Sequence, residues 1–193
     1  MTQLMTEQGI VKVPAGTWKV DQSHSSVAFE VKHMMISTVR GLLSEYDGRL
    51  EAQEDPEQST VTGWAAAASI DTGDADRDAH LRGPDFFDAD RYPRLSFVST
   101  AIRHLEGGTY AVTGDLTIKG VTREVTVEAT VQGTGEDPWG NQRAGIAVRG
   151  SIDRTDFGLT WNQALEAGGV LVGNEIKISV EVELLREVPA AAA

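Results

Sequence analysis

Several long segments of the chain alternate apolar and polar residues with a period of two. Val125, Val127 and Ala129 are separated by single polar residues. The same alternation recurs at 27–31, 112–118, 146–152 and 176–184 and, less regularly, at 64–70 and 95–102. Successive side chains of a strand point to opposite faces, so this pattern predicts strands with one dry face and one wet face.

Helical periodicity is scarce, and the candidates are short, around 34–36, 76–81, 84–87 and 162–166. Short helices cannot cover the dry face of about eight strands, so the sheet must bury that face against itself, as a barrel or a sandwich. Strands of about ten residues or more favour the barrel. We therefore expect an all-β protein, an antiparallel barrel with short helices in its connections. A barrel of about eight strands is filled by side chains or holds one small ligand. Small residues at positions expected to point inward favour a cavity: Ala66, Ala68, Gly114, Ala129 and Gly150.

Composition excludes several functional classes. Seventeen basic and 29 acidic residues give a net charge of −12, which argues against a protein that binds nucleic-acid phosphates. The absence of cysteine excludes disulfides and cysteine-based metal sites. No run approaches the roughly 20 apolar residues of a membrane span, and the first residues have no signal-peptide core. We therefore expect a cytoplasmic protein.

A length of 193 residues fits a single domain. The alternating pattern begins and ends well inside the chain, and the last residues are Pro189 followed by alanines. We expect the domain to span residues 16–186, between flexible tails at 1–15 and 187–193.

An acidic segment without alternation, residues 71–90, is longer than a plain connection needs. Asp74, Asp76 and Asp78 have the spacing that opens a calcium-binding loop, but Ala79 stands where that loop requires glycine. Acidic residues also favour the N-terminus of a helix. The sequence favours a capped short helix here and predicts no metal.

Arg77, Asp78 and His80 in this segment have two interpretations. They could pair with one another and fix the loop, or they could face the polar head of a ligand. Phe86 and Phe87 likewise could anchor the segment on the barrel or line a ligand entrance. Both pairs of alternatives remain open on the sequence.

No catalytic constellation stands out. His24, His33 and His80 are isolated, and neither a nucleophile elbow nor a zinc-protease histidine pair is present. We expect no enzymatic activity, no catalytic residues and no cofactor.

Three stretches carry a resemblance to a known family. The first includes Trp18 to Asp21 with His24 and His33, the second Ile70 to Phe97, and the third Thr113 to Thr122 with Arg154 to Gly158 and the last strand pattern. In these stretches the chain resembles the YceI-like family of lipocalin-like, lipid-binding barrels. The resemblance implies an antiparallel barrel that holds a polyisoprenoid or a fatty-acid derivative, no established catalysis, and often a homodimer.

We therefore expect the barrel to bind, and to carry or sequester, a long-chain lipid. Each buried CH₂ contributes about 0.8 kcal/mol, which supports useful affinity without many polar contacts. The residues expected to contact the tail are Val27, Phe29, Val31, Ala66, Ala68, Phe97, Val127, Ala129, Val148 and Ile178. Those expected at the mouth are His33, Arg77, Asp78, His80, Phe86 and Phe87. The alternatives are an enzyme acting on a lipid head at the mouth and a filled structural barrel without a ligand.

Overall fold

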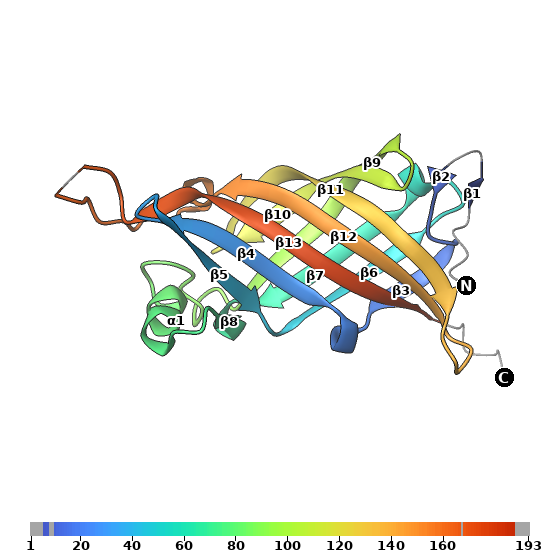
Figure 1. Ribbon diagram of the computed structural model, residues 1–193, viewed down its shortest axis with the longest axis horizontal. Coiled ribbons are helices and arrows are strands. Elements are labelled where there is room, and N and C mark those ends of the chain that lie inside the picture. Colours follow the sequence, from blue (N-terminus) through green and yellow to red (C-terminus); the bar gives the residue numbers. More distant parts are fainter. Residues whose placement is uncertain (1–5, 8–9, 167, 188–193) are drawn as a thin grey trace.

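Eight strands hydrogen-bond edge to edge into a closed antiparallel ring (Figure 1). The structure is a computed structural model, and it describes residues 6–7, 10–166 and 168–187. The ring strands are β3 (Gly16–Val20), β6 (Tyr46–Ala52), β7 (Thr60–Ala66), β9 (Arg94–Glu106), β10 (Thr109–Ile118), β11 (Val121–Glu136), β12 (Gln142–Asp153) and β13 (Val172–Arg186). They follow one another in that order, and β13 pairs with both β12 and β3. The predicted all-β barrel is confirmed.

Strands β3 and β4 (Ser26–His33) share the edge of β13 that faces away from β12, and β4 extends the barrel wall at one end. Residues 184–186 of β13 pair with β3, whereas residues 172–181 pair with β4. Strand β4 continues the sheet into β5 (Ser37–Leu43) and the short β8 (Ile70–Asp71). The remaining two strands, β1 (Thr6–Glu7) and β2 (Ile10–Val11), pair with each other.

Helical structure in the described residues is confined to short connections. The α-helix α1 (Ala75–Arg82) lies at the left-hand end of the barrel in Figure 1, beside β8. Single 3₁₀ turns are formed by η1 (Gln22–His24), η2 (Pro56–Gln58), η3 (Ala67–Ser69) and η4 (Arg154–Phe157). No helix among the described residues is long and apolar enough to cross a membrane.

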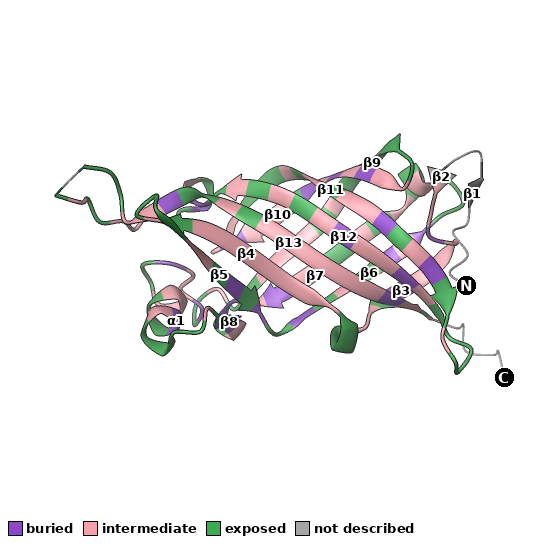
Figure 2. Ribbon diagram, viewed as in Figure 1, coloured by how far each residue is buried: buried purple, intermediate pink, exposed green. Residues whose placement is uncertain are grey.

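The period-two pattern becomes the two faces of the barrel wall. Along β10, Tyr110, Val112 and Ile118 are buried, and in Figure 2 strand β12 changes repeatedly between exposed, intermediate and buried positions along its length. Closure of the ring removes its free edges and lets the dry faces of opposite strands share one interior.

Strand β7 has the opposite phase to the one that its sequence suggests. Directly opposite residues of an antiparallel pair share a face, and buried Tyr46 and Leu50 stand opposite Ala65 and Val61. Trp64 stands opposite the exposed Asp47, and its indole lies 4.0 Å, centroid to guanidinium carbon, under Arg94.

The prediction that Ala66 and Ala68 point into the barrel is therefore wrong. Ala66 ends β7 in the phase of Trp64, and Ala68 is exposed in the turn η3. Strand β7 ends at Ala66, and the chain then forms the turn η3; the amides of Ala66 and Ala67 still donate to the carbonyls of Glu45 and Pro93.

Two of the small inward residues make room for neighbours rather than for a cavity. A Cβ placed on Gly114 would lie 2.5 Å from the ring of Phe97, and one on Gly150 would lie 2.7 Å from Val127 Cγ1. Larger side chains of the adjacent strands therefore fill the space that these glycines leave.

One end of the barrel is closed by an apolar cluster around Trp18. The indole is 1% exposed, packs among Leu50, Tyr110 and Leu184, and donates through Nε1 to the carbonyl of Pro14 at 2.9 Å. Residues 11–15, expected in the N-terminal tail, belong to this closure: Val13 is buried in the cluster and the Tyr110 hydroxyl donates to the carbonyl of Val11. Of the expected C-terminal tail, Glu187 donates from its amide to Thr17, and residues 188–193 lie outside the described residues.

Replacing Trp18 with alanine should lower the free energy of unfolding by about 3–5 kcal/mol, because it removes a fully buried aromatic ring. Trp139→Ala is the matched control, since that indole is 80% exposed and its loss should change stability by less than about 0.5 kcal/mol. Urea unfolding followed by circular dichroism measures both. Equal losses in the two variants would contradict this view of the closed end.

A candidate ligand cavity and its two ends

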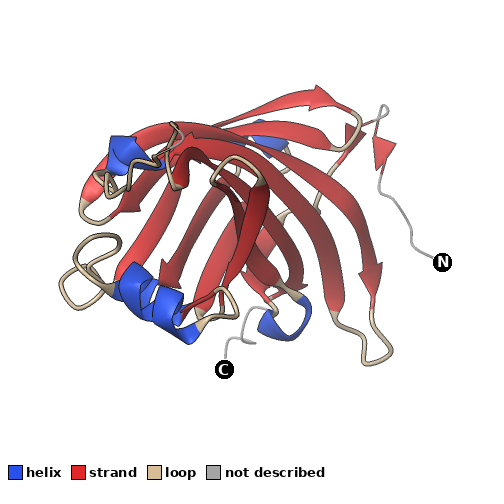
Figure 3. Cartoon of the chain, turned by 60° about the vertical axis from the view of Figure 1, so that its left-hand side comes forward, coloured by secondary structure: helices blue, strands red, loops and turns tan. Residues whose placement is uncertain are grey.

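The interior of the barrel contains a cavity of about 690 Å³. Every strand of the ring contributes apolar side chains to its wall. Figure 3 brings the α1 end of the barrel forward and shows the ring of strands around this interior. The volume falls within the roughly 300–1,000 Å³ of typical small-molecule sites.

Most residues predicted to contact a ligand tail lie on this wall. The eight that do are Val27, Phe29, Val31, Phe97, Val127, Ala129, Val148 and Ile178. Ala66 and Ala68 do not, for the reason given above. Sequence alternation therefore identifies the wall wherever the phase of the strand is correctly assigned.

The acidic segment forms the capped helix α1 that the sequence favours. The Asp74 carboxylate accepts a hydrogen bond from the amide of Arg77 at 3.0 Å, and Asp76 and Asp78 lie in the first turn. Negative charge at this position interacts favourably with the helix dipole and so stabilises the helix. The aspartates are thus accounted for by capping, and Asp78 is committed to a buried contact of its own.

Arg77 and Asp78 do not pair with each other; both are held by Thr72. The Thr72 hydroxyl donates to Asp78 Oδ1 at 2.6 Å and accepts from Arg77 Nε at 2.7 Å. Arg77 Nη2 donates to the Thr72 carbonyl at 3.0 Å. Asp78 is buried and lies off the cavity wall, whereas Arg77 is part of the wall. Thr72 could not be identified as the shared partner from the sequence, because a threonine in a loop has no distinctive pattern.

His80 lies on the cavity wall in an aromatic setting. Its Nε2 is 3.0 Å from Asp85 Oδ2, and its ring meets those of Phe86 and Trp161 edge to face at centroid distances of 5.1 and 4.7 Å. Phe86 is buried, so it anchors this segment on the barrel and also lines the cavity. Phe87 and His33 lie on the same wall, His33 at the end of β4. Anchoring the segment on the barrel and lining the cavity, the two roles considered for these phenylalanines, are therefore compatible with each other.

Arg154 is a wall residue that sequence reasoning missed. It is 3% exposed, and its guanidinium donates to the carbonyls of Gly173 and Trp161, both at 2.9 Å, and to that of Leu159. Burial lowers the pKa of this guanidinium from its ordinary value. Arg154 stands in a stretch that carries the family resemblance, but its burial is not evident from the sequence, because it follows a strand among polar neighbours.

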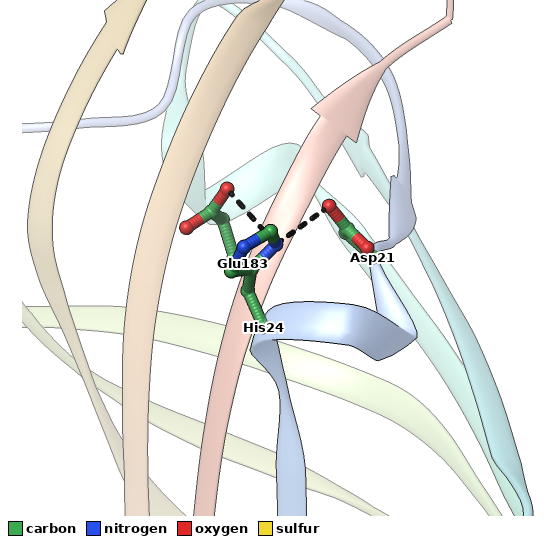
Figure 4. Close-up of side chains that lie close together, drawn as sticks. All are labelled: Asp21, His24 and Glu183. Carbon is green, nitrogen blue, oxygen red and sulfur yellow. Dashed lines mark hydrogen bonds and ion pairs between the residues drawn. The ribbon is translucent and has the colours of Figure 1, made fainter. Parts of the chain in front are cut away.

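The opposite end of the barrel carries a cluster of ionisable side chains (Figure 4). His24 Nδ1 lies 3.0 Å from Asp21 Oδ2 and 4.0 Å from Glu183 Oε1. The same two carboxylate oxygens pair with Arg143 Nη1, at 2.7 and 2.5 Å. Three such groups could ligate a metal ion, but the arginine already occupies the oxygens that would do so. We interpret the cluster as an ionic closure of this end.

Comparison with known proteins agrees with this architecture. The model of the YceI-like domain matches residues 18–184, and the chain therefore belongs to the YceI-like family. A UPF0312 protein of Staphylococcus epidermidis (strain ATCC 12228) is 38% identical over 165 residues, which cover 84% of this chain and 94% of that protein.

Two solved structures have the same fold. BcnA of Burkholderia cenocepacia superposes with a TM-score of 0.75 at 28% identity, covering 85% of this chain and 98% of that one. A polyisoprenoid binding domain from Saccharophagus degradans superposes with a TM-score of 0.67 at 12% identity, covering 88% and 98%. The second likeness concerns the fold alone.

The ionic closure should make stability depend on pH in a defined direction. Hydrogen bonds from Arg143 and then from His24 hold the pKa of Asp21 well below its ordinary value. A lowered folded-state pKa stabilises the fold above the unfolded pKa of about 4, and this stabilisation is lost as the pH falls through the folded value. Asp21→Asn should therefore lower the melting temperature at pH 7, and the difference from the wild type should shrink below about pH 4.

Thermal scans between pH 2 and pH 8 measure this difference. Asp115→Asn is the control, since Asp115 is exposed and has no ion pair among the described residues. A difference that is independent of pH would exclude the carboxylate charge of Asp21 as its cause.

Proposed function

We propose that the barrel binds a long-chain apolar ligand, a polyisoprenoid or a fatty-acid-like lipid, with its chain in the central cavity. The observation that carries the proposal is the cavity of about 690 Å³ lined by apolar side chains from all eight ring strands. Carriage or sequestration is the role that such a site supports, because enclosure removes an insoluble chain from water.

Partial exposure of the inward apolar side chains supports the same conclusion. Val27, Phe29, Val127 and Ile178 line the cavity, and none of them is fully buried. Their side chains could lose further contact with water against a ligand, at about 25 cal/mol for each Å² covered. A filled structural barrel would have buried these residues instead, so the cavity argues against that alternative.

We propose that the eight wall residues predicted from the sequence contact the chain of the ligand. Ala129 and Val148 stand directly opposite each other on β11 and β12, so together they form one short section of the wall. A polyisoprenoid is one suitable chain; the Saccharophagus degradans domain with this fold is described as binding one. Selection among chains of similar length is expected to be weak, because one methylene discriminates by only about 1–3 kcal/mol.

We propose no catalytic role for the mouth. A hydrolase would need a nucleophile activated by a base, and no hydroxyl group among the described residues is hydrogen-bonded to the imidazole of His33 or His80. His80 instead pairs with Asp85 and packs against two aromatic rings.

Filling part of the cavity should weaken binding strongly. In Ala129→Trp the indole would displace part of the chain, and the loss of three or so methylene contacts would weaken binding about 50-fold. Titration with hexadecan-1-ol, followed by native mass spectrometry, measures the change. Val148→Phe, which alters the opposite residue more mildly, provides a second variant if the first does not fold.

Ala68→Trp is the matched control, because Ala68 is exposed in the turn η3 and should accept the same substitution with no effect on binding. Unchanged affinity in both folded wall variants, or no binding of hexadecan-1-ol or farnesol by the wild-type protein, would overturn the proposed function.

A further inference from the structure

Two arginines, Arg77 and Arg154, line the cavity toward its α1 end. Four other arginines form ion pairs with carboxylates: Arg40, Arg49, Arg143 and Arg149. Arg77 and Arg154 lie on the wall, and neither has a carboxylate within ion-pair distance among the described residues. Arg49, which also lines the cavity, is instead paired with Glu51 and Glu187.

The guanidinium of Arg77 is held in one orientation, but not all of its N–H groups are used in hydrogen bonds to described residues. Thr72 accepts from its Nε and Nη2, which fixes the plane of the guanidinium, and buried Asp78 in turn fixes Thr72 through both its amide and its hydroxyl. Nη1 donates to no other described residue. A guanidinium held in this way offers a preorganised donor edge to an oxyanion.

Arg154 adds a buried positive charge to the same end of the cavity. Its hydrogen bonds go to neutral carbonyl oxygens, and no carboxylate pairs with it directly, although the neighbouring Asp153 acts on it electrostatically. One of these carbonyls belongs to Trp161, whose ring contacts His80 of α1 at 4.7 Å between centroids. Arg154 is therefore connected to the α1 side of the cavity. A buried charge without a counter-ion is costly, and a bound anion would reduce that cost.

Two of the acidic groups nearby are engaged by other residues, and a third, Asp76, is exposed to solvent, which screens its charge. Asp78 is committed to Thr72 and lies off the wall, and Asp85 pairs with His80. Asp76 is on the wall in the first turn of α1 and makes no ion pair with a described residue. The imidazoles of His33 and His80 supply further polar groups on the wall.

We propose that the α1 end of the cavity binds the anionic head of the ligand, a carboxylate or a phosphate at the end of the apolar chain, with Arg77 as the direct contact and Arg154 as a buried charge behind it. This inference rests on the proposed function, which concerns the chain, and adds the class of head group. The ligand would then lie with its head at α1 and its chain directed toward the Trp18 cluster.

A matched series of ligands with one chain tests the head group. Hexadecyl phosphate and palmitic acid carry an anionic head, whereas hexadecan-1-ol and palmitamide are neutral. Titrated into the wild-type protein at pH 8, the anionic pair should bind at least about tenfold more tightly, because hydrogen bonds to charged groups are roughly twice as strong as those between neutral groups.

Arg77→Gln should remove most of this preference, and it should lower the affinity for hexadecan-1-ol far less than that for the anionic pair. Arg123→Gln is the matched control, since Arg123 is exposed, lies off the cavity wall and donates to the Thr122 carbonyl. It removes the same net charge from the chain, so it should leave the preference for an anion intact.

The possible outcomes separate this inference from the proposed function. Equal binding of charged and neutral heads by the wild type, or an equal loss for both in Arg77→Gln, would overturn the anionic-head inference while the apolar chain site stands. Binding of none of the four compounds would overturn the proposed function and this inference with it.

Discussion

The structure depends on one event, the pairing of β13 with β12 on one edge and with β3 and β4 on the other. This closes the sheet on itself, which is the way a chain with so little helix can bury the apolar faces of its strands. The number of strands then fixes the width of the interior. A cavity is thus the consequence of a ring of eight strands whose inward side chains do not meet across the centre.

The two ends of this ring are built differently. At one end Trp18 and its neighbours form an apolar cluster. Near the same end Arg143 forms ion pairs with three carboxylates from separate parts of the chain, those of Asp21, Asp137 and Glu183. At the other end the wall is completed by α1 and by the segment around Trp161, whose contacts are aromatic and polar. A barrel closed at one end and polar at the other suits a ligand that has an apolar chain and a distinct head.

The amino-acid sequence predicts the fold and most of the wall because alternation depends directly on which face of a strand is dry. Val127, Val148 and Ile178 lie on the cavity wall where this reasoning puts them. It fails at β7, because Trp64 is an apolar residue on the outer face, where Arg94 covers its ring. Taking Trp64 as an inward residue shifts the assigned phase of β7 by one residue. Ala66 and Ala68 are then predicted to point into the barrel, although neither does.

Contacts between distant segments account for what the sequence could not reveal about the mouth. Asp78 is next to Arg77 in the chain, yet the two meet only through Thr72. The burial of Arg154 depends on carbonyl groups at 159–173, which reach it only when β12 and β13 are paired. Gly114 and Gly150 suggest empty space in the sequence, whereas neighbouring side chains fill it. Such features follow from the packing of the barrel and have no local pattern.

The most direct test of the central claim is a crystal structure of the protein with a long-chain fatty acid brominated at the end of its chain. The account predicts one anomalous bromine peak inside the ring, between the wall at Ala129 and Val148 and the Trp18 cluster, with the carboxylate near Arg77. A bromine peak on the outer surface of the barrel would contradict it.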